Sequence, residues 1–156
     1  GAVDLNDVSV CVTLGAAQDN AKVWDVDSGR LLRTLEGRTV CSLWPPTFSS
    51  EGSRVLTATA NDSATVSDVE TGEPVCALDG HTGVVCSATF SSDGRTVLTA
   101  SADGTAKVWD AGTGEVLRSL EADTGLVRSA SFSPGGETVL TEYVDGTARV
   151  WTADSG

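Results

Sequence analysis

The chain has 156 residues and a formal net charge of −12, and its composition is 40% hydrophobic but only 5% aromatic. This length is typical of one domain, and the excess of acidic side chains disfavours binding to the phosphate backbone of nucleic acids. No apolar run approaches the roughly 18 residues that would predict a membrane span, and no signal or transit segment is visible at the start.

A short segment recurs along the chain, with spacings of 43, 42 and 42 residues between positions 24, 67, 109 and 151. Three of these positions hold Trp, and the second holds Ser67. Self-similarity at a fixed period indicates a protein built from structural repeats. The copies are AKVWD at 21–25, ATVSD at 64–68, AKVWD at 106–110 and ARVWT at 148–152.

Each repeat is predicted to be a four-stranded antiparallel meander. The third repeat is the clearest, because turn pairs such as Asp93-Gly94 and Asp103-Gly104 separate runs of strand length. Connections this short join antiparallel neighbours. The expected strands of the third repeat are 84–90, 96–101, 106–110 and 116–120. The expected units are approximately 1–36, 37–79, 80–121 and 122–156.

The units at the two ends are expected to be incomplete. Residue 1 aligns with the interior of a first strand, and Gly156 lies in the turn after a third strand. The sequence contains no Met, which predicts a processed product or a fragment. The prediction is therefore an all-β chain of about four meanders, open at both ends.

In the third unit, Gly80-His81 lies near the start, Trp109-Asp110 lies near the end, and the unit is about 42 residues long. This pattern resembles the WD-repeat family. Parts of the pattern recur at the same offset in the other units, so the resemblance covers essentially the whole chain. It implies that the meanders are blades of a β-propeller, a single propeller segment over residues 1–156.

The resemblance implies a hydrogen-bonded network inside the third unit. Its members would be His81, a hydroxyl of the second strand (Thr99 or Ser101), Asp103 and Trp109. Buried imidazole, hydroxyl and indole groups need partners, and a satisfied network makes a blade rigid. A His, an Asp and a hydroxyl can suggest a catalytic triad. Between stacked blades they would have no access to substrate, so the expected role is structural.

The other units depart from this pattern. The second has Arg38, Asn61 and Ser67 where the third has His, Asp and Trp, and the fourth has Asp123 at the His position. We therefore expect the second unit to be the weakest.

Four blades can be part of a closed propeller in more than one way. Propellers use four to eight blades, and by resemblance this family usually closes with about seven. An open arc would expose apolar blade faces. Three arrangements follow: a segment of a larger propeller, two copies closing an eight-bladed ring, or four blades closing alone.

The sequence predicts neither a cofactor nor a metal. Its four cysteines form no CxxC pair and have no His at ligand spacing. They are expected to be small buried hydrophobes, although disulfides remain an alternative. Free thiols favour a reducing compartment, so a cytoplasmic location is expected. The cysteines are Cys11, Cys41, Cys76 and Cys86.

Candidate contacts for a partner lie near the starts of the first strands, where the resemblance places the mouth of a central channel. Arg128 is distinctive because its counterparts are cysteines, and Arg is enriched among interface hot spots. It could equally be a solvent-facing side chain that balances nearby acids. Trp44 belongs to a three-residue insertion with Pro45 and Pro46, which suits a bulge near the channel or drift in a degenerate unit. The candidates are Arg128, Ser129, Cys86, Ser87, Cys41 and Trp44.

The expected function is that of an interaction scaffold for a protein or peptide, without catalysis of its own. The negative charge suggests a basic partner, although it could serve only solubility. The alternative is a regulatory or sensor domain appended to an enzyme whose catalytic domain lies outside this chain. No complete constellation of acid, base and nucleophile supports an enzyme within these residues.

Overall fold

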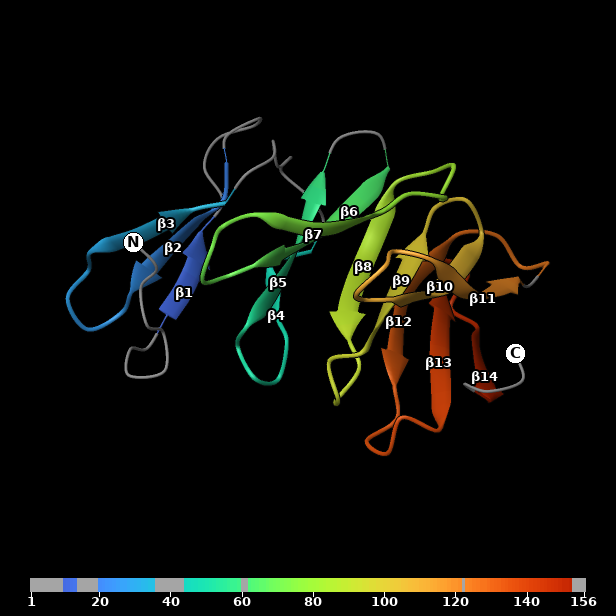
Figure 1. The fold of residues 1–156 in the computed structure, drawn as a ribbon. Helices are drawn as coiled ribbons and strands as arrows, with labels where there is room; N and C mark the ends of the chain where they lie inside the picture. Colours follow the sequence, from blue (N-terminus) through green and yellow to red (C-terminus); the bar gives the residue numbers. More distant parts are fainter. Residues whose placement is uncertain (1–9, 14–19, 36–43, 60–61, 122, 153–156) are drawn as a thin grey trace.

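The computed structural model describes residues 10–13, 20–35, 44–59, 62–121 and 123–152. Every regular element among these residues is a β-strand (Figure 1). In this described part, no helix is long and apolar enough to cross a membrane. The strands form four antiparallel sheets, and hydrogen-bonded neighbours in each sheet are consecutive in the sequence.

The sheets follow one another in chain order. The first contains β1 (Val10–Thr13), β2 (Lys22–Asp25) and β3 (Leu31–Thr34). The second contains β4 (Thr47–Phe48), β5 (Arg54–Thr59), β6 (Ser63–Asp68) and β7 (Pro74–Leu78). The third contains β8 (Val85–Phe90), β9 (Thr96–Ser101), β10 (Thr105–Asp110) and β11 (Val116–Glu121). The fourth contains β12 (Val127–Phe132), β13 (Thr138–Tyr143) and β14 (Ala148–Thr152).

This strand order is that of a meander, and the predicted all-β fold of antiparallel meanders is confirmed. The largest departure from regularity is in the second sheet, where β4 has only two residues whereas β8 has six. Pro45 and Pro46 directly precede β4. Because proline has no backbone N–H to donate to a ladder, the pair prevents β4 from starting earlier.

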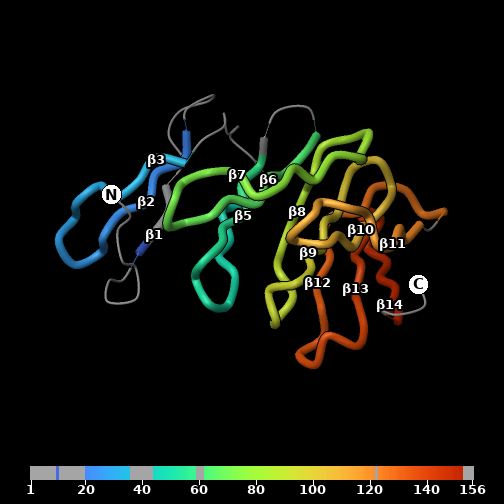
Figure 2. Tube along the Cα trace, viewed as in Figure 1, coloured from blue at the N-terminus to red at the C-terminus, as the bar shows by residue number. Residues whose placement is uncertain are grey.

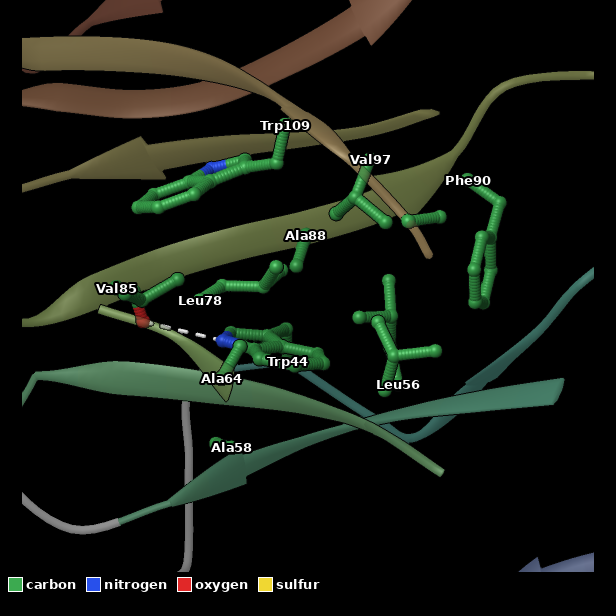
Figure 3. Packing of buried hydrophobic residues seen from close by; sticks show 12 residues of the cluster. Trp44, Leu56, Ala58, Ala64, Leu78, Val85, Ala88, Phe90, Val97 and Trp109 are labelled. Atoms are coloured by element: carbon green, nitrogen blue, oxygen red, sulfur yellow. Dashed lines mark hydrogen bonds between the residues drawn. The ribbon is translucent and has the colours of Figure 1, made fainter. Parts of the chain in front are cut away.

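Successive sheets pack face to face, and the first and fourth sheets lie at opposite ends of the row (Figure 2). The third sheet is covered on both faces. Val97 of β9 belongs to the core shared with the second sheet (Figure 3), and its neighbour Leu98 belongs to the core shared with the fourth. Successive side chains of a strand point to opposite faces. Burial in β9 is therefore continuous from residue 97 to residue 101 instead of alternating.

The turn after β10 brings the third sheet into contact with the second. Asp110 Oδ1 accepts hydrogen bonds from the backbone N–H groups of Gly112 and Thr113, at 2.8 and 2.9 Å. Gly114 closes the turn with a φ of +79°, a conformation that favours glycine because it has no Cβ. Its position against the second sheet leaves no room for a side chain, since a Cβ there would lie 2.5 Å from the backbone oxygen of Ala77.

Replacing Gly114 with Ala is expected to destabilise the protein more than the same change at Gly29. Gly29 occupies the equivalent turn of the first sheet with a φ of +71° but has nothing within 4 Å of its added Cβ. Both changes incur the left-handed backbone penalty of about 1 kcal/mol, and only Gly114→Ala adds a clash with backbone. Thermal unfolding followed by circular dichroism compares the two. Equal losses in Tm would show that the Gly114 turn relaxes without cost.

Candidate functional site

The third sheet holds a connected hydrogen-bond network that joins β9 and β10 with the turn between them and with the segment before β8. Trp109 Nε1 donates to Thr99 Oγ1 at 2.8 Å, and Thr99 Oγ1 lies 2.6 Å from His81 Nε2. His81 Nδ1 lies 2.8 Å from Asp103 Oδ2. Thr99 accepts from the indole, so its own proton is free to be donated to His81 Nε2. The geometry then fits a neutral imidazole whose Nδ1–H donates to Asp103.

The pKa values of the two titratable groups in the network, His81 and Asp103, are both shifted in the direction that favours this arrangement. Burial is the main cause that lowers the pKa of His81, and it outweighs the opposing effect of Asp103. Burial on its own raises the pKa of Asp103, but hydrogen bonds from Thr105, His81 and Thr82 outweigh it and lower that pKa to about 2. At neutral pH the network therefore contains a neutral His and an ionised Asp.

The network is closed to solvent, with side-chain exposures of 0% for His81 and 8% for Asp103. Its hydroxyl, Thr99, is fully buried as well. Ser101, the alternative hydroxyl, instead donates to the backbone oxygen of Gly83 at 2.9 Å. The Ser101 Oγ also accepts from the Asp103 N–H. These side chains therefore hold turns and strands together.

The fourth sheet contains a related network without histidine. Trp151 Nε1 donates to Thr141 Oγ1 at 2.9 Å, and Thr141 donates to the buried hydroxyl of Tyr143 at 3.2 Å. A phenol thus takes the role of the imidazole. In the second sheet the Trp position holds Ser67, whose buried hydroxyl has no hydrogen-bond partner. The expected weakness of this sheet stays a prediction, although an unsatisfied buried hydroxyl is in itself unfavourable.

Two of the candidate contact residues occupy β-bulges at equivalent places in neighbouring sheets. The pairing of β8 with β9 skips Cys86, and the pairing of β12 with β13 skips Arg128. A bulged residue is unpaired in the ladder, so its side chain is re-aimed. Cys86 is half-buried, and desolvation raises the pKa of its thiol. Arg128 is 66% exposed.

Arg128 is not isolated at this position. Its Nη2 lies 3.3 Å from Glu142 Oε2, and the same oxygen accepts a hydrogen bond from Ser129 at 3.1 Å. Sequence reasoning missed Glu142, although a signal was present: the equivalent positions of the second and third units hold Ala58 and Ala100. A carboxylate at a position that holds Ala in the second and third units indicates that this position has a different role in the fourth unit.

Exposed apolar residues lie two positions before each bulge in the sequence and on the turn that pairs with the second of these segments. Val84, Leu126 and Val144 are all exposed, and the Val144 N–H donates to the Leu126 oxygen at 3.1 Å. Ser87 Oγ accepts from the Ala130 N–H at 3.3 Å, which joins the innermost strands of the third and fourth sheets. We call the set with Arg128 the bulge surface; its members are Val84, Cys86, Leu126, Arg128 and Val144.

The structure places one further candidate, Trp44, away from the bulge surface. Trp44 is only 5% exposed and packs in the core between the second and third sheets (Figure 3), where its Nε1 donates to the Val85 oxygen at 3.1 Å. This burial corrects the interpretation of Trp44 as a surface contact, since the indole lies in the core that forms where the second and third sheets meet. Cys41 lies outside the described residues.

Within the described residues, no group of three or more His, Cys, Asp or Glu side chains is arranged to hold a metal ion. The two cysteines whose side chains the structure describes, Cys76 and Cys86, are free.

Comparison with known proteins explains the repeated geometry. The sequence model of the family described as "WD domain, G-beta repeat" matches residues 72–110 and 114–152, which together make half of the chain. The chain belongs to the WD-repeat family. Its four sheets are therefore blades of a β-propeller, numbered one to four from the N-terminal side. WD-repeat domains typically mediate protein interactions and are generally not catalytic.

Each match begins with the outermost strand of one blade and ends with the third strand of the next. The first match spans β7 to β10, and the second spans β11 to β14. The sequence repeat is thus offset from the blade. Each repeat contains strands of two neighbouring blades and so links them. Many solved structures share the fold. One is the crystal structure of the computationally designed Ika4 protein, with a TM-score of 0.77 and 31% sequence identity, covering 92% of this chain and 84% of that chain. No curated protein sequence matches the chain.

Proposed function

We propose that this chain is a scaffold that binds a protein or peptide on the bulge surface of blades three and four. The observation that carries the proposal is the pair of equivalent bulges. They present Arg128 among exposed Val84, Leu126 and Val144 on adjoining blades. A cluster of exposed apolar side chains around an Arg is the composition of an interface centre rather than of an ordinary surface.

The charge of the chain supports a basic partner. With 22 acidic and 10 basic residues, the long-range field attracts cationic surfaces and increases the rate of encounter. Arg128 is a local exception to this field. A partner that is basic overall, with an apolar anchor and a carboxylate placed for Arg128, would complement both features.

Two other interpretations stay predictions. A regulatory domain appended to an enzyme would use the same blades and depends on sequence outside these residues. The cytoplasmic location rests on the expectation of free thiols.

Arg128→Glu is expected to weaken peptide binding. Peptides selected from a random phage-displayed library against the immobilised chain should bind the Arg128→Glu chain at least tenfold more weakly, a loss of about 1.4 kcal/mol or more. Arg118→Glu is the matched control, because Arg118 is an exposed arginine on the outermost strand of blade three. Unchanged binding by the Arg128→Glu chain would refute the bulge surface, and failure to select any peptide would count against the binding function itself.

A further inference from the structure

One face of blade four, the face turned away from blade three, has apolar side chains at its centre, and no other described part of the chain covers it. Leu140 and Val150 are paired across β13 and β14 on this face. Val150 is 71% exposed, whereas Val108, at the same place in blade three, is 6% exposed. The neighbouring Ala148 is exposed, whereas its counterpart Ala106 is fully buried.

The same face of every other blade is a packing surface. In blade three, Leu98 and Val108 belong to the core shared with blade four. In blade two, Leu56 and Val66 form the same cross-strand pair and belong to the core shared with blade three. In blade one, Val23 lies in the core shared with blade two. The exposed face of blade four thus repeats a surface that binds the next blade three times within this chain.

The matching surface is also present on the chain, at the other end of the row of blades (Figure 1). Trp109 of blade three packs towards blade two, so the face that carries this Trp receives the preceding blade. In blade one, this face carries Trp24 and the exposed Lys22. Lys22 and Glu142 give the two surfaces opposite charges, which favours their association.

We infer that the uncovered face of blade four binds blade one of a second copy of this chain. A contact between two different faces of identical chains closes when the rotation between the copies allows it. Two copies related by a two-fold axis would make the contact twice. The result is a ring of eight blades, within the range that propellers use.

This inference rests on the proposed binding function, because it names a second copy as one partner, but it uses a different surface. The interface involves Leu140 and Val150, whereas the peptide site involves Arg128. The two proposals can therefore fail separately. The Val150 variants described next are expected to bind the selected peptides as the wild-type chain does, so that loss of the dimer and loss of the peptide site are observed separately.

Size-exclusion chromatography with multi-angle light scattering tests the inference on the purified chain. The wild-type chain is expected to show the mass of two chains at high concentration, decreasing towards one chain on dilution. Val150→Glu is expected to show the mass of one chain throughout that range. Val150→Ser, which keeps an uncharged side chain, should lie between them. Because Val150 is largely exposed, near-UV circular dichroism of both variants should match that of the wild type.

Leu117→Glu is the matched control, since Leu117 is an exposed leucine on the outermost strand of blade three and lies outside the proposed contact. It should show the mass of two chains. Three results would overturn the inference: a wild-type mass of one chain at every concentration, a Val150→Glu mass equal to that of the wild type, or dissociation by Leu117→Glu as well. A wild-type mass that rises beyond two chains would refute the closed ring.

Discussion

Replacing Trp109 with Ala is expected to lower the free energy of unfolding by about 3–5 kcal/mol, the usual cost of deleting a buried Trp side chain. Trp109 is fully buried between blades two and three (Figure 3). Its removal would leave a cavity there and would also remove the hydrogen bond to Thr99. Thr99 would then keep only the imidazole of His81 as a side-chain partner. Urea unfolding followed by circular dichroism measures the loss.

Trp151→Ala provides the matched control, because Trp151 occupies the same place in blade four and makes the equivalent hydrogen bond to Thr141. It is only half-buried and packs at the edge of the core that blades three and four share, whereas Trp109 is fully buried. The loss should therefore be clearly smaller than for Trp109. Equal losses would show that the hydrogen bond, which both share, determines stability rather than burial between blades.

The blades could be predicted from the sequence because the residues that define them are close together in the chain and recur in each unit. Turn pairs such as Asp93-Gly94 define the strand ends, and the recurring Trp defines the register. Each strand of blade three begins and ends within one residue of its predicted position. Because the pattern of strands and turns recurs, each unit gives separate evidence for it, whereas a strand that occurs once gives only one observation.

The candidate site was less predictable because it depends on contacts between blades. Trp44 looked like a surface residue, since it lies in an insertion next to two prolines. Only the approach of blade three shows that its indole is buried and bonded to the Val85 oxygen. Glu142 was overlooked for the opposite reason: its strand position is ordinary, and its partner Arg128 reaches it through a bulge that no local pattern reveals.

Asp103 is expected to be the next most important side chain, and Asp103→Ala should cost about 3 kcal/mol at pH 7. Its carboxylate accepts from His81 and from the Thr82 N–H through Oδ2, and from Thr105 through Oδ1. Truncation would leave the buried His81 Nδ1 without its carboxylate partner. Asp145→Ala is the control, because Asp145 has the same place in blade four but is exposed and, among the described residues, accepts hydrogen bonds only from Thr147. Its effect should be much smaller.

The pH dependence distinguishes loss of the ionised carboxylate from loss of packing. The pKa of Asp103 falls from an ordinary value of 3.8 to about 2 in the folded chain. A lowered pKa means that the folded state binds the proton less readily than the unfolded state. The stabilisation is therefore present above pH 3.8 and is lost as the pH falls towards 2, by roughly 2 kcal/mol. Other carboxylates titrate in the same range, so the informative quantity is the difference in unfolding free energy between wild type and Asp103→Ala. That difference should shrink between pH 5 and pH 2 if the ionised carboxylate stabilises the blade, whereas a constant difference would mean that Asp103 acts only by filling space.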